Sequence, residues 1–149
     1  MVESKAEIYE RILSFIKNSQ NSKKETLYAE LVNLLFNYFS YMNWVGFYVK
    51  DEEKEELFLS YYVGNDACEI IPTNKGVCGK CFVEGKTQLV PDVHQLPYHI
   101  ACSSTTNSEI VVPIFKENKC VSVLDIDSNI FNAFDEIDKK YLEEIVKHL

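Results

Sequence analysis

The sequence predicts an α+β fold in which helices at both ends of the chain pack on a mainly antiparallel sheet of five or six strands. Apolar residues recur at helical spacing near both ends of the chain. Between them lie short runs of aromatic and β-branched residues that are typical of strands. With 149 residues the chain can bury one substantial core, so we expect a single domain over residues 1–149.

The helices are predicted from their capping patterns. Residues 4–7 have the form of a capping box and begin a first helix that runs to about Asn18. Residues 22–25 repeat this pattern and predict a longer helix that ends near Tyr41. Asp135 can cap a final helix with an apolar stripe. These three helices flank the region of predicted strands.

The strands are predicted as two hairpins and one short addition. Residues 44–49 and 57–63 are separated by an acidic turn, and residues 110–115 and 121–126 by a short polar one. Residues 88–90 form a further strand candidate. Between the hairpins lies a long stretch without clear periodicity, which contains four of the five cysteines and two of the three histidines. Long loops of this kind are usually functional.

Charge and cysteine content exclude several classes of function. The net charge of −8 disfavours binding to nucleic acid or to an anionic membrane, because both require a positive field. The sequence has no apolar run long enough to span a bilayer and no secretory signal, so we expect a cytoplasmic protein. Five cysteines in such a chain are more consistent with thiol chemistry or core positions than with a static disulfide framework.

Cys78 and Cys81 form a CxxC motif that is ambiguous alone. It can be a redox dithiol, half of a zinc site, or two buried apolar residues. A zinc site would need further ligands from His94, His99 or Cys102, whose spacing is irregular, and we therefore predict no metal. A thioredoxin-type motif would need a βαβ setting, which the surrounding pattern does not indicate.

Several motifs keep their order and mutual spacing along most of the chain. They are Asn43–Tyr48, Gly76–Gly79, Gln88–His94, His99–Cys102, Ser108–Pro113 and Leu124–Ser128. This series resembles the free methionine-(R)-sulfoxide reductases, a family of single GAF domains. The resemblance implies a GAF-like fold and reduction of free methionine sulfoxide without a cofactor, with thioredoxin as reductant and a homodimer as a possible assembly.

The resemblance also implies roles for three cysteines. Cys102 would be the nucleophile, Cys78 the principal resolving thiol, and Cys68 a second resolving or relay thiol. A thiol suits this chemistry, because attack on the sulfoxide sulfur leaves a sulfenic acid that a second thiol converts to a disulfide. An external dithiol then restores the enzyme by exchange. Cys81 and Cys120 lie outside the pattern and are expected to be inert.

Acidic and aromatic residues complete the site implied by the resemblance. Glu109, Asp125 and Asp127 match active-site acids, which could donate a proton and hold the substrate's ammonium group. Trp44 and Tyr48 match aromatic residues that line the substrate pocket, where ring faces suit a methyl group and a partly positive sulfur. Backbone amides near Gly76–Gly79, if they open a helix, could bind the substrate carboxylate.

Simpler interpretations of these residues remain open at this stage. The aromatic pair can be ordinary core, and Asp125 and Asp127 can cap the turn through Asn129. His94 and His99 can be structural, or His99 can tune the reactivity of the cysteine at position 102. For the whole protein, the main alternative is a non-catalytic GAF module that binds a small molecule, followed by a general thiol redox protein.

Overall fold

The computed structural model describes residues 2–149. The helices of this range are α1 (Lys5–Lys17), α2 (Lys24–Tyr38), α3 (Gly76–Glu84) and α4 (Glu136–Val146), with a short 3₁₀ helix at Val93–Gln95. The strands are β1 (Trp44–Lys50), β2 (Glu56–Val63), β3 (Ile70–Pro72), β4 (Gln88–Val90), β5 (Ser108–Lys116) and β6 (Lys119–Ser128).

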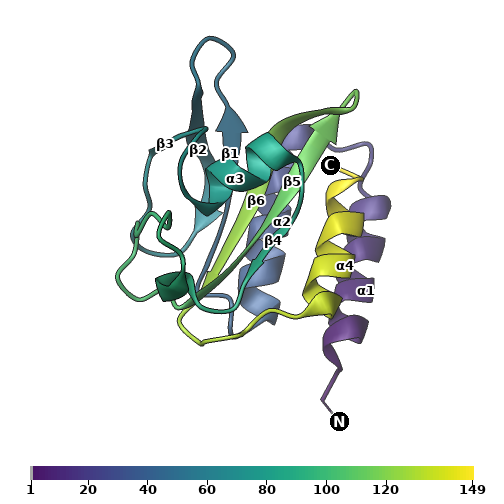
Figure 1. Ribbon diagram of the computed structural model, residues 1–149. Coiled ribbons are helices and arrows are strands. Elements are labelled where there is room, and N and C mark those ends of the chain that lie inside the picture. Colours follow the sequence, from purple (N-terminus) through teal and green to yellow (C-terminus); the bar gives the residue numbers. More distant parts are fainter. Residues whose placement is uncertain (1) are drawn as a thin grey trace.

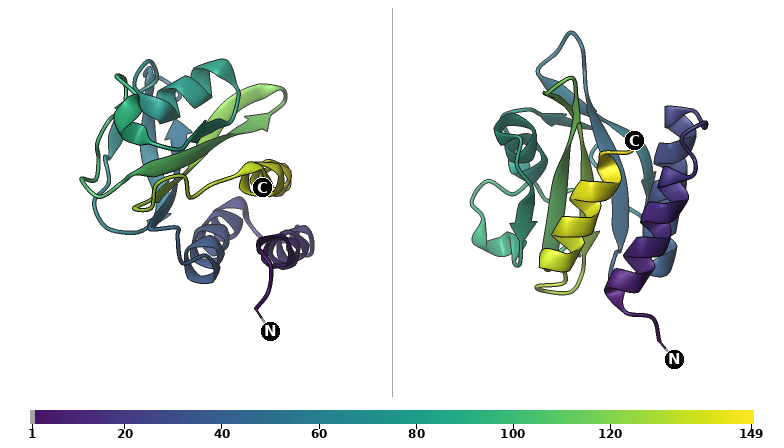
Figure 2. Two further views of the ribbon diagram at one scale, coloured as in Figure 1. Left: turned by 60° about the horizontal axis from the view of Figure 1, so that its bottom comes forward. Right: turned by 90° about the vertical axis from the view of Figure 1, so that its right-hand side faces the viewer.

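The strands form one sheet in the order β3-β2-β1-β6-β5-β4, and every neighbouring pair is antiparallel. Figure 1 shows α3 in front of this sheet and α2 behind it. In Figure 2, α1, α2 and α4 lie together on one face, and α3 lies with the long loops on the other. The predicted α+β class with a mainly antiparallel sheet is therefore confirmed.

Each face of the sheet covers its own apolar cluster, because successive side chains of a strand point to opposite sides. On β1, Val45 and Phe47 are buried against the three terminal helices. Trp44 and Tyr48 point to the other face and join a smaller cluster beneath α3. The smaller cluster includes Cys78 and Cys81, and Cys68 packs against it.

The helix starts agree with the sequence only in part. At α1 the capping box is present, since Ser4 Oγ accepts from the Glu7 amide at 3.2 Å and Glu7 Oε1 accepts from the Ser4 amide at 3.2 Å. The box expected at residues 22–25 is wrong: Lys23 precedes α2 without a side-chain cap, and the Ser22 amide instead donates to Ser19 in a preceding turn. Helix α2 also ends at Tyr38, earlier than predicted.

Both predicted hairpins and the short strand at residues 88–90 are confirmed, and the second hairpin extends beyond its predicted bounds. The aperiodic stretch contains two elements that the sequence did not predict, β3 and α3. Gly76 allows α3 to begin, because its φ of 70° is unfavourable for other residues and Ile100 packs against the place where a Cβ would lie. None of the helices in the described part of the chain combines the length and apolar character that a bilayer crossing requires.

One buried acid ties the terminal helices together. Asp138 of α4 is fully buried, and its Oδ1 accepts hydrogen bonds from the Tyr9 hydroxyl at 2.6 Å and the Tyr41 hydroxyl at 2.7 Å. Its Oδ2 accepts from Lys5 Nζ at 2.7 Å and from the Asp135 amide at 2.8 Å. Both oxygens of this carboxyl group are therefore fully partnered.

Candidate active site

Three acids lie next to one another on the face of the sheet that α3 covers. The register of the central strands pairs Glu109 of β5 with Asp127 of β6, and Asp127 with Trp44 of β1. Asp125 lies two residues before Asp127 on the same strand and faces the same side, where it pairs with Gly46. Strand pairing alone thus places three carboxyl groups and an indole close together on one face of the sheet.

Burial raises the pKa of each of these acids. For Glu109 the loss of hydration acts first, and the charges of Asp125 and Asp127 raise its pKa well above the ordinary value. The pKa of Asp127 is raised by burial and then by Asp125, whereas hydrogen bonds partly oppose the effect of burial on the pKa of Asp125. Each acid has one buried oxygen without a hydrogen-bond partner. The cluster can therefore hold a proton near neutral pH and accept a cationic ligand.

Two aromatic side chains form the wall beside the acids. The rings of Trp44 and Tyr48 are stacked with their centroids 6.0 Å apart, and both side chains are buried. The indole lies over Gly46, where any Cβ would come within 2.4 Å of Trp44 Cη2. Both rings line the same cavity as the acids, so their contribution to the core does not prevent contact with a ligand.

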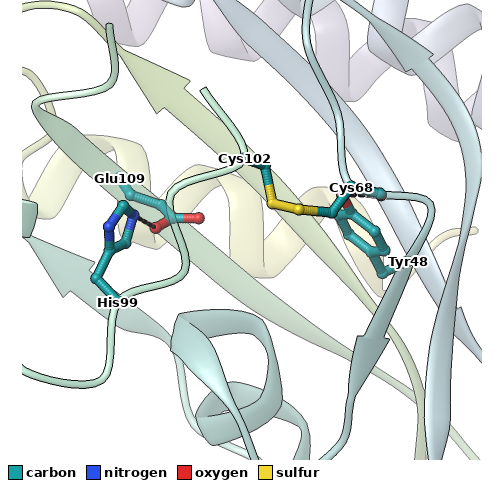
Figure 3. Close-up of a disulfide and its surroundings, with 5 residues drawn as sticks. All are labelled: Tyr48, Cys68, His99, Cys102 and Glu109. Atoms are coloured by element: carbon teal, nitrogen blue, oxygen red, sulfur yellow. Dashed lines mark hydrogen bonds and ion pairs between the residues drawn. A yellow bond between two sulfur atoms is a disulfide. The ribbon is translucent and has the colours of Figure 1, made fainter. Parts of the chain in front are cut away.

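A disulfide joins Cys68 to Cys102 across two loops, with their Cα atoms 5.3 Å apart (Figure 3). The Tyr48 hydroxyl donates to the Cys68 carbonyl at 2.8 Å, which positions one of these loops against the aromatic wall. The sequence resemblance placed Cys78 ahead of Cys68 as the partner of Cys102. In the structure the bonded partner of Cys102 is Cys68, and Cys78 is a free, buried thiol on α3.

Cys78 points instead toward the acids. Burial raises the pKa of its thiol, and the charges of Asp125 and Glu109 raise it further. Its neighbour in the CxxC motif, Cys81, turns to the sheet and donates from Sγ to the Val111 carbonyl at 3.5 Å. The two cysteines of the motif therefore have different surroundings, as expected for one turn of a helix that begins at the cavity and continues over the core.

The acids, aromatic rings and cysteines enclose one small cavity of about 30 Å³. This volume accommodates about one or two water molecules, so it is too small for an amino acid. Its lining contains all the residues predicted for the site except Cys68, whose neighbour Ala67 lines it instead. The sequence did not single out Asp66 and Thr106, which also line the cavity from the loops.

His99 contacts the acids rather than the disulfide. Its Nε2 lies 3.7 Å from Glu109 Oε1, and Figure 3 shows the imidazole facing that carboxyl group. Burial and then the nearby His94 lower the pKa of His99, which favours its neutral form. His94 itself points away and hydrogen-bonds Asn107 through Nε2 at 2.8 Å.

The turn after β6 does not use the two aspartates as caps. The Asn129 amide donates to Asn43 Oδ1 at 2.6 Å, and Asp127 contributes only its backbone carbonyl, which accepts from the Asn43 amide at 2.9 Å. The carboxyl groups of Asp125 and Asp127 remain on the cavity side. Their position is therefore better explained by a ligand site than by turn capping.

Fold and site together define the class of protein. The family model of the GAF domain matches residues 25–149, which include the sheet, α3 and every cavity residue named above. The chain belongs to this family, as the sequence resemblance predicted.

Within that class the chain belongs to the free methionine-R-sulfoxide reductases. It is 36% identical to the free methionine-R-sulfoxide reductase of Escherichia coli, over 89% of this chain and 81% of that protein. The enzyme of Neisseria meningitidis, solved with its substrate, superimposes with a TM-score of 0.93 at 39% identity, covering 99% of this chain and 89% of the other. The reduced enzyme of Staphylococcus aureus gives a TM-score of 0.86 at 41% identity, covering 98% and 93%. These relatives favour an enzyme over a non-catalytic binding module.

Proposed function

We propose that this protein reduces free methionine-(R)-sulfoxide to methionine, with Cys102 as nucleophile and Cys68 as the thiol that closes on it. The disulfide between these two cysteines, at the wall of a cavity lined by three buried carboxyl groups, is the observation that supports this most directly. It brings a pair of sulfur atoms within bonding distance beside groups that can supply protons.

The first step transfers the sulfoxide oxygen to the enzyme. The Cys102 thiolate attacks the sulfoxide sulfur while the oxygen takes up a proton, for which Glu109 and Asp127 are suited because burial raises the pKa of each. The sulfur–oxygen bond of the substrate then breaks, and the oxygen passes to Cys102 Sγ as a hydroxyl group while the new bond between the two sulfur atoms breaks. Methionine leaves with the electron pair of that sulfur–sulfur bond, and Cys102 becomes a sulfenic acid.

The second step removes that oxygen as water. The Cys68 thiol attacks the sulfur of the Cys102 sulfenic acid, and the two cysteines form the disulfide with loss of water. A dithiol protein, which we propose is thioredoxin in the cytoplasm, reduces the disulfide by two exchange reactions and becomes oxidised itself. Cys78 is not needed as the first resolving thiol in this cycle. Residues 1–149 would act as one GAF-like domain, alone or as a homodimer.

Selectivity for the free amino acid would follow from two binding groups in the cavity, one for the ammonium group of the substrate and one for its carboxylate. The carboxyl oxygens of Glu109, Asp125 and Asp127 that have no partner would bind the ammonium group. Helix α3 begins at the cavity without a side-chain cap, so its first amides would bind the carboxylate. A methionine inside a peptide offers neither charge. Because the cavity of the disulfide form is small, we expect substrate to bind only after reduction has released the two loops.

The test is methionine release from resolved diastereomers of methionine sulfoxide. Prereduced protein, freed of reductant, should release one equivalent of methionine from the R form and none from the S form. Dithiothreitol should then support repeated turnover. Cys102→Ser should abolish both activities, and equal activity of this variant would exclude Cys102 as the nucleophile.

The same assay tests whether Cys68 or Cys78 forms the disulfide with Cys102. Cys68→Ser should release one equivalent of methionine and then accumulate a sulfenic acid, which a dimedone-type probe detects. Cys78→Ser should still release methionine and form the disulfide between residues 68 and 102. Cys120→Ser, which alters a thiol outside the cavity, serves as the matched control. Disulfide formation in Cys68→Ser at the wild-type rate would return the resolving role to Cys78.

A further inference from the structure

We infer that the cavity binds a single zinc ion through Cys78, Glu109 and Asp125. Metal binding does not require the proposed reaction and can occur while Cys68 and Cys102 are joined in the disulfide; only the inhibitory effect of the ion rests on the proposed function. The ion would act as an inhibitory ligand rather than a cofactor, because it occupies the carboxyl groups proposed to bind the ammonium group.

The three ligand atoms are already close together. The Sγ of Cys78 and one carboxyl oxygen each from Glu109 and Asp125 all lie within 4.8 Å of one another. Tetrahedral zinc, with Zn–S near 2.3 Å and Zn–O near 2.0 Å, needs ligand separations of about 3.5 Å. Side-chain adjustments of about 1 Å would therefore complete three coordination positions, and a water molecule or Asp127 would supply the fourth.

The carboxyl groups have unused capacity for a cation. Glu109 Oε1, Asp125 Oδ1 and Asp127 Oδ1 are buried and have no hydrogen-bond partner, and Glu109 and Asp125 are each only 5% exposed. Within residues 2–149, no lysine or arginine forms an ion pair with any of the three. His99 lies 3.7 Å from Glu109 Oε1, but its lowered pKa favours the neutral form. A buried group of acids without a full countercharge is costly, and a bound dication would offset that cost.

The donor set and the space select the kind of ion. A thiolate with two carboxylates suits zinc, whereas magnesium and calcium prefer oxygen ligands alone. Coordination deprotonates a thiol even where burial has raised its pKa, as it has for Cys78. The cavity of about 30 Å³ accommodates an ion with one water molecule, although it excludes an amino acid.

This site differs from the zinc site that a CxxC motif would suggest. Cys81 faces the Val111 carbonyl and lies outside the ligand cluster, and Cys102 is held in the disulfide. The ligands come instead from α3, β5 and β6, which lie far apart in the sequence and meet only in the fold. A zinc site built on the CxxC motif would therefore include Cys81, which is not a ligand in the proposed site.

The experiment is a cobalt titration of the oxidised protein, in which Cys68 and Cys102 can supply no thiolate. We expect uptake of one Co²⁺ per chain with a thiolate-to-cobalt charge-transfer band, and stoichiometric displacement of the cobalt by Zn²⁺. X-ray absorption of the zinc-loaded wild type should show one sulfur ligand near 2.3 Å, with oxygen or nitrogen at the other positions. Neither measurement requires turnover, so failure of the proposed reaction would leave the result intact.

Variants identify the ligands. Cys78→Ser should lose the charge-transfer band and bind cobalt more weakly by at least about tenfold. Glu109→Gln should keep the band and also bind more weakly, whereas Cys120→Ser should behave as wild type. The proposal is overturned if wild type takes up no stoichiometric cobalt, if the band survives in Cys78→Ser, or if the zinc spectrum contains no sulfur. The zinc spectrum uses wild-type protein, so it decides the matter even if Cys78→Ser does not fold.

Discussion

Two sets of buried carboxyl groups lie on opposite faces of the same sheet, and they differ in how they are partnered. On the helical face, Asp138 receives hydrogen bonds from Tyr9, Tyr41 and Lys5. On the face covered by α3, Glu109, Asp125 and Asp127 are packed against one another, and each retains an oxygen with no partner. The acids on the two faces are therefore similarly buried, but Asp138 is fully hydrogen-bonded and the three cavity acids are not.

The difference separates a structural acid from acids that keep free hydrogen-bonding capacity. A buried polar group that is fully hydrogen-bonded contributes to a unique packing, whereas an unsatisfied one costs stability. Asp138 connects α1, the segment before β1 and α4, which together cover one face of the sheet. Apart from the contact of Glu109 with His99, the three cavity acids face only the cavity and its lining, and a ligand that binds them would offset the cost of their burial.

The largest effect expected is the loss of stability in Asp138→Ala. Removal of this carboxyl group leaves the Tyr9 and Tyr41 hydroxyls without their acceptor, while Lys5 keeps only its ion pair with Asp135 at 3.3 Å. The free energy of unfolding should therefore fall by about 3 to 5 kcal/mol. Urea unfolding followed by circular dichroism measures this change. Glu136→Ala, on the exposed first turn of the same helix, is the control and should change little. A loss below about 1 kcal/mol in Asp138→Ala would break the comparison.

The next effect concerns activity, on the other face of the sheet. Asp125→Asn removes a negative charge that has no cationic partner, so the free energy of unfolding should stay the same or rise. The kcat/KM for methionine-(R)-sulfoxide should fall by about a hundredfold or more, as expected for the loss of a buried charge that binds the substrate's ammonium group. Steady-state kinetics and urea unfolding of the same preparation test both parts. A large loss of stability would place Asp125 with the structural acids.

A smaller effect should follow from removal of one donor to Asp138. Tyr41→Phe deletes a hydroxyl that donates at 2.7 Å, and the free energy of unfolding should fall by about 1 to 2 kcal/mol. Tyr38→Phe is a suitable control, because Tyr38 is 47% exposed. Equal stability of the two variants would indicate that water replaces this hydrogen bond.

The smallest expected effect is a loss of stability at alkaline pH. Burial, followed by the hydrogen bond to Asp138, raises the pKa of Tyr41 above its ordinary value. Because the folded pKa exceeds the unfolded one, this contribution is complete below about pH 10 and is lost as the pH rises toward the folded pKa. Wild type should therefore lose stability above about pH 10 more steeply than Tyr41→Phe. Parallel curves from urea unfolding across this range would contradict the assignment.

The sequence predicted those parts of the fold that local patterns determine. Strand alternation and turn residues identified both hairpins, and Ser4 with Glu7 identified the start of α1. Helix α3 escaped prediction because Gly76 and Gly79 have low helix propensity. Its stability comes from Val77 and other buried side chains packed on the sheet, which no local pattern reveals.

The residues proposed for the site could be named from the sequence, but their geometry could be predicted only in part. Family motifs pointed to the acids, the aromatic pair and the three cysteines, yet the order of Cys68 and Cys78 depends on where two loops meet α3. Spacing along the chain contains no information on that distance. The approach of His99 to Glu109 is likewise set by a loop, and its signal in the sequence was only a histidine close to Cys102.

The bridge between Cys68 and Cys102 has a consequence for the mobility of the backbone. It spans 34 positions and ties the loop at residues 64–69 to the loop at residues 96–107, neither of which belongs to a strand. Formation of the disulfide restricts the motion of both loops, and its reduction removes that restriction. Amide hydrogens in these loops should therefore exchange with solvent at rates set by the oxidation state, while those of the central strands stay protected throughout. Exchange rates in these two loops would then distinguish oxidised molecules from reduced ones.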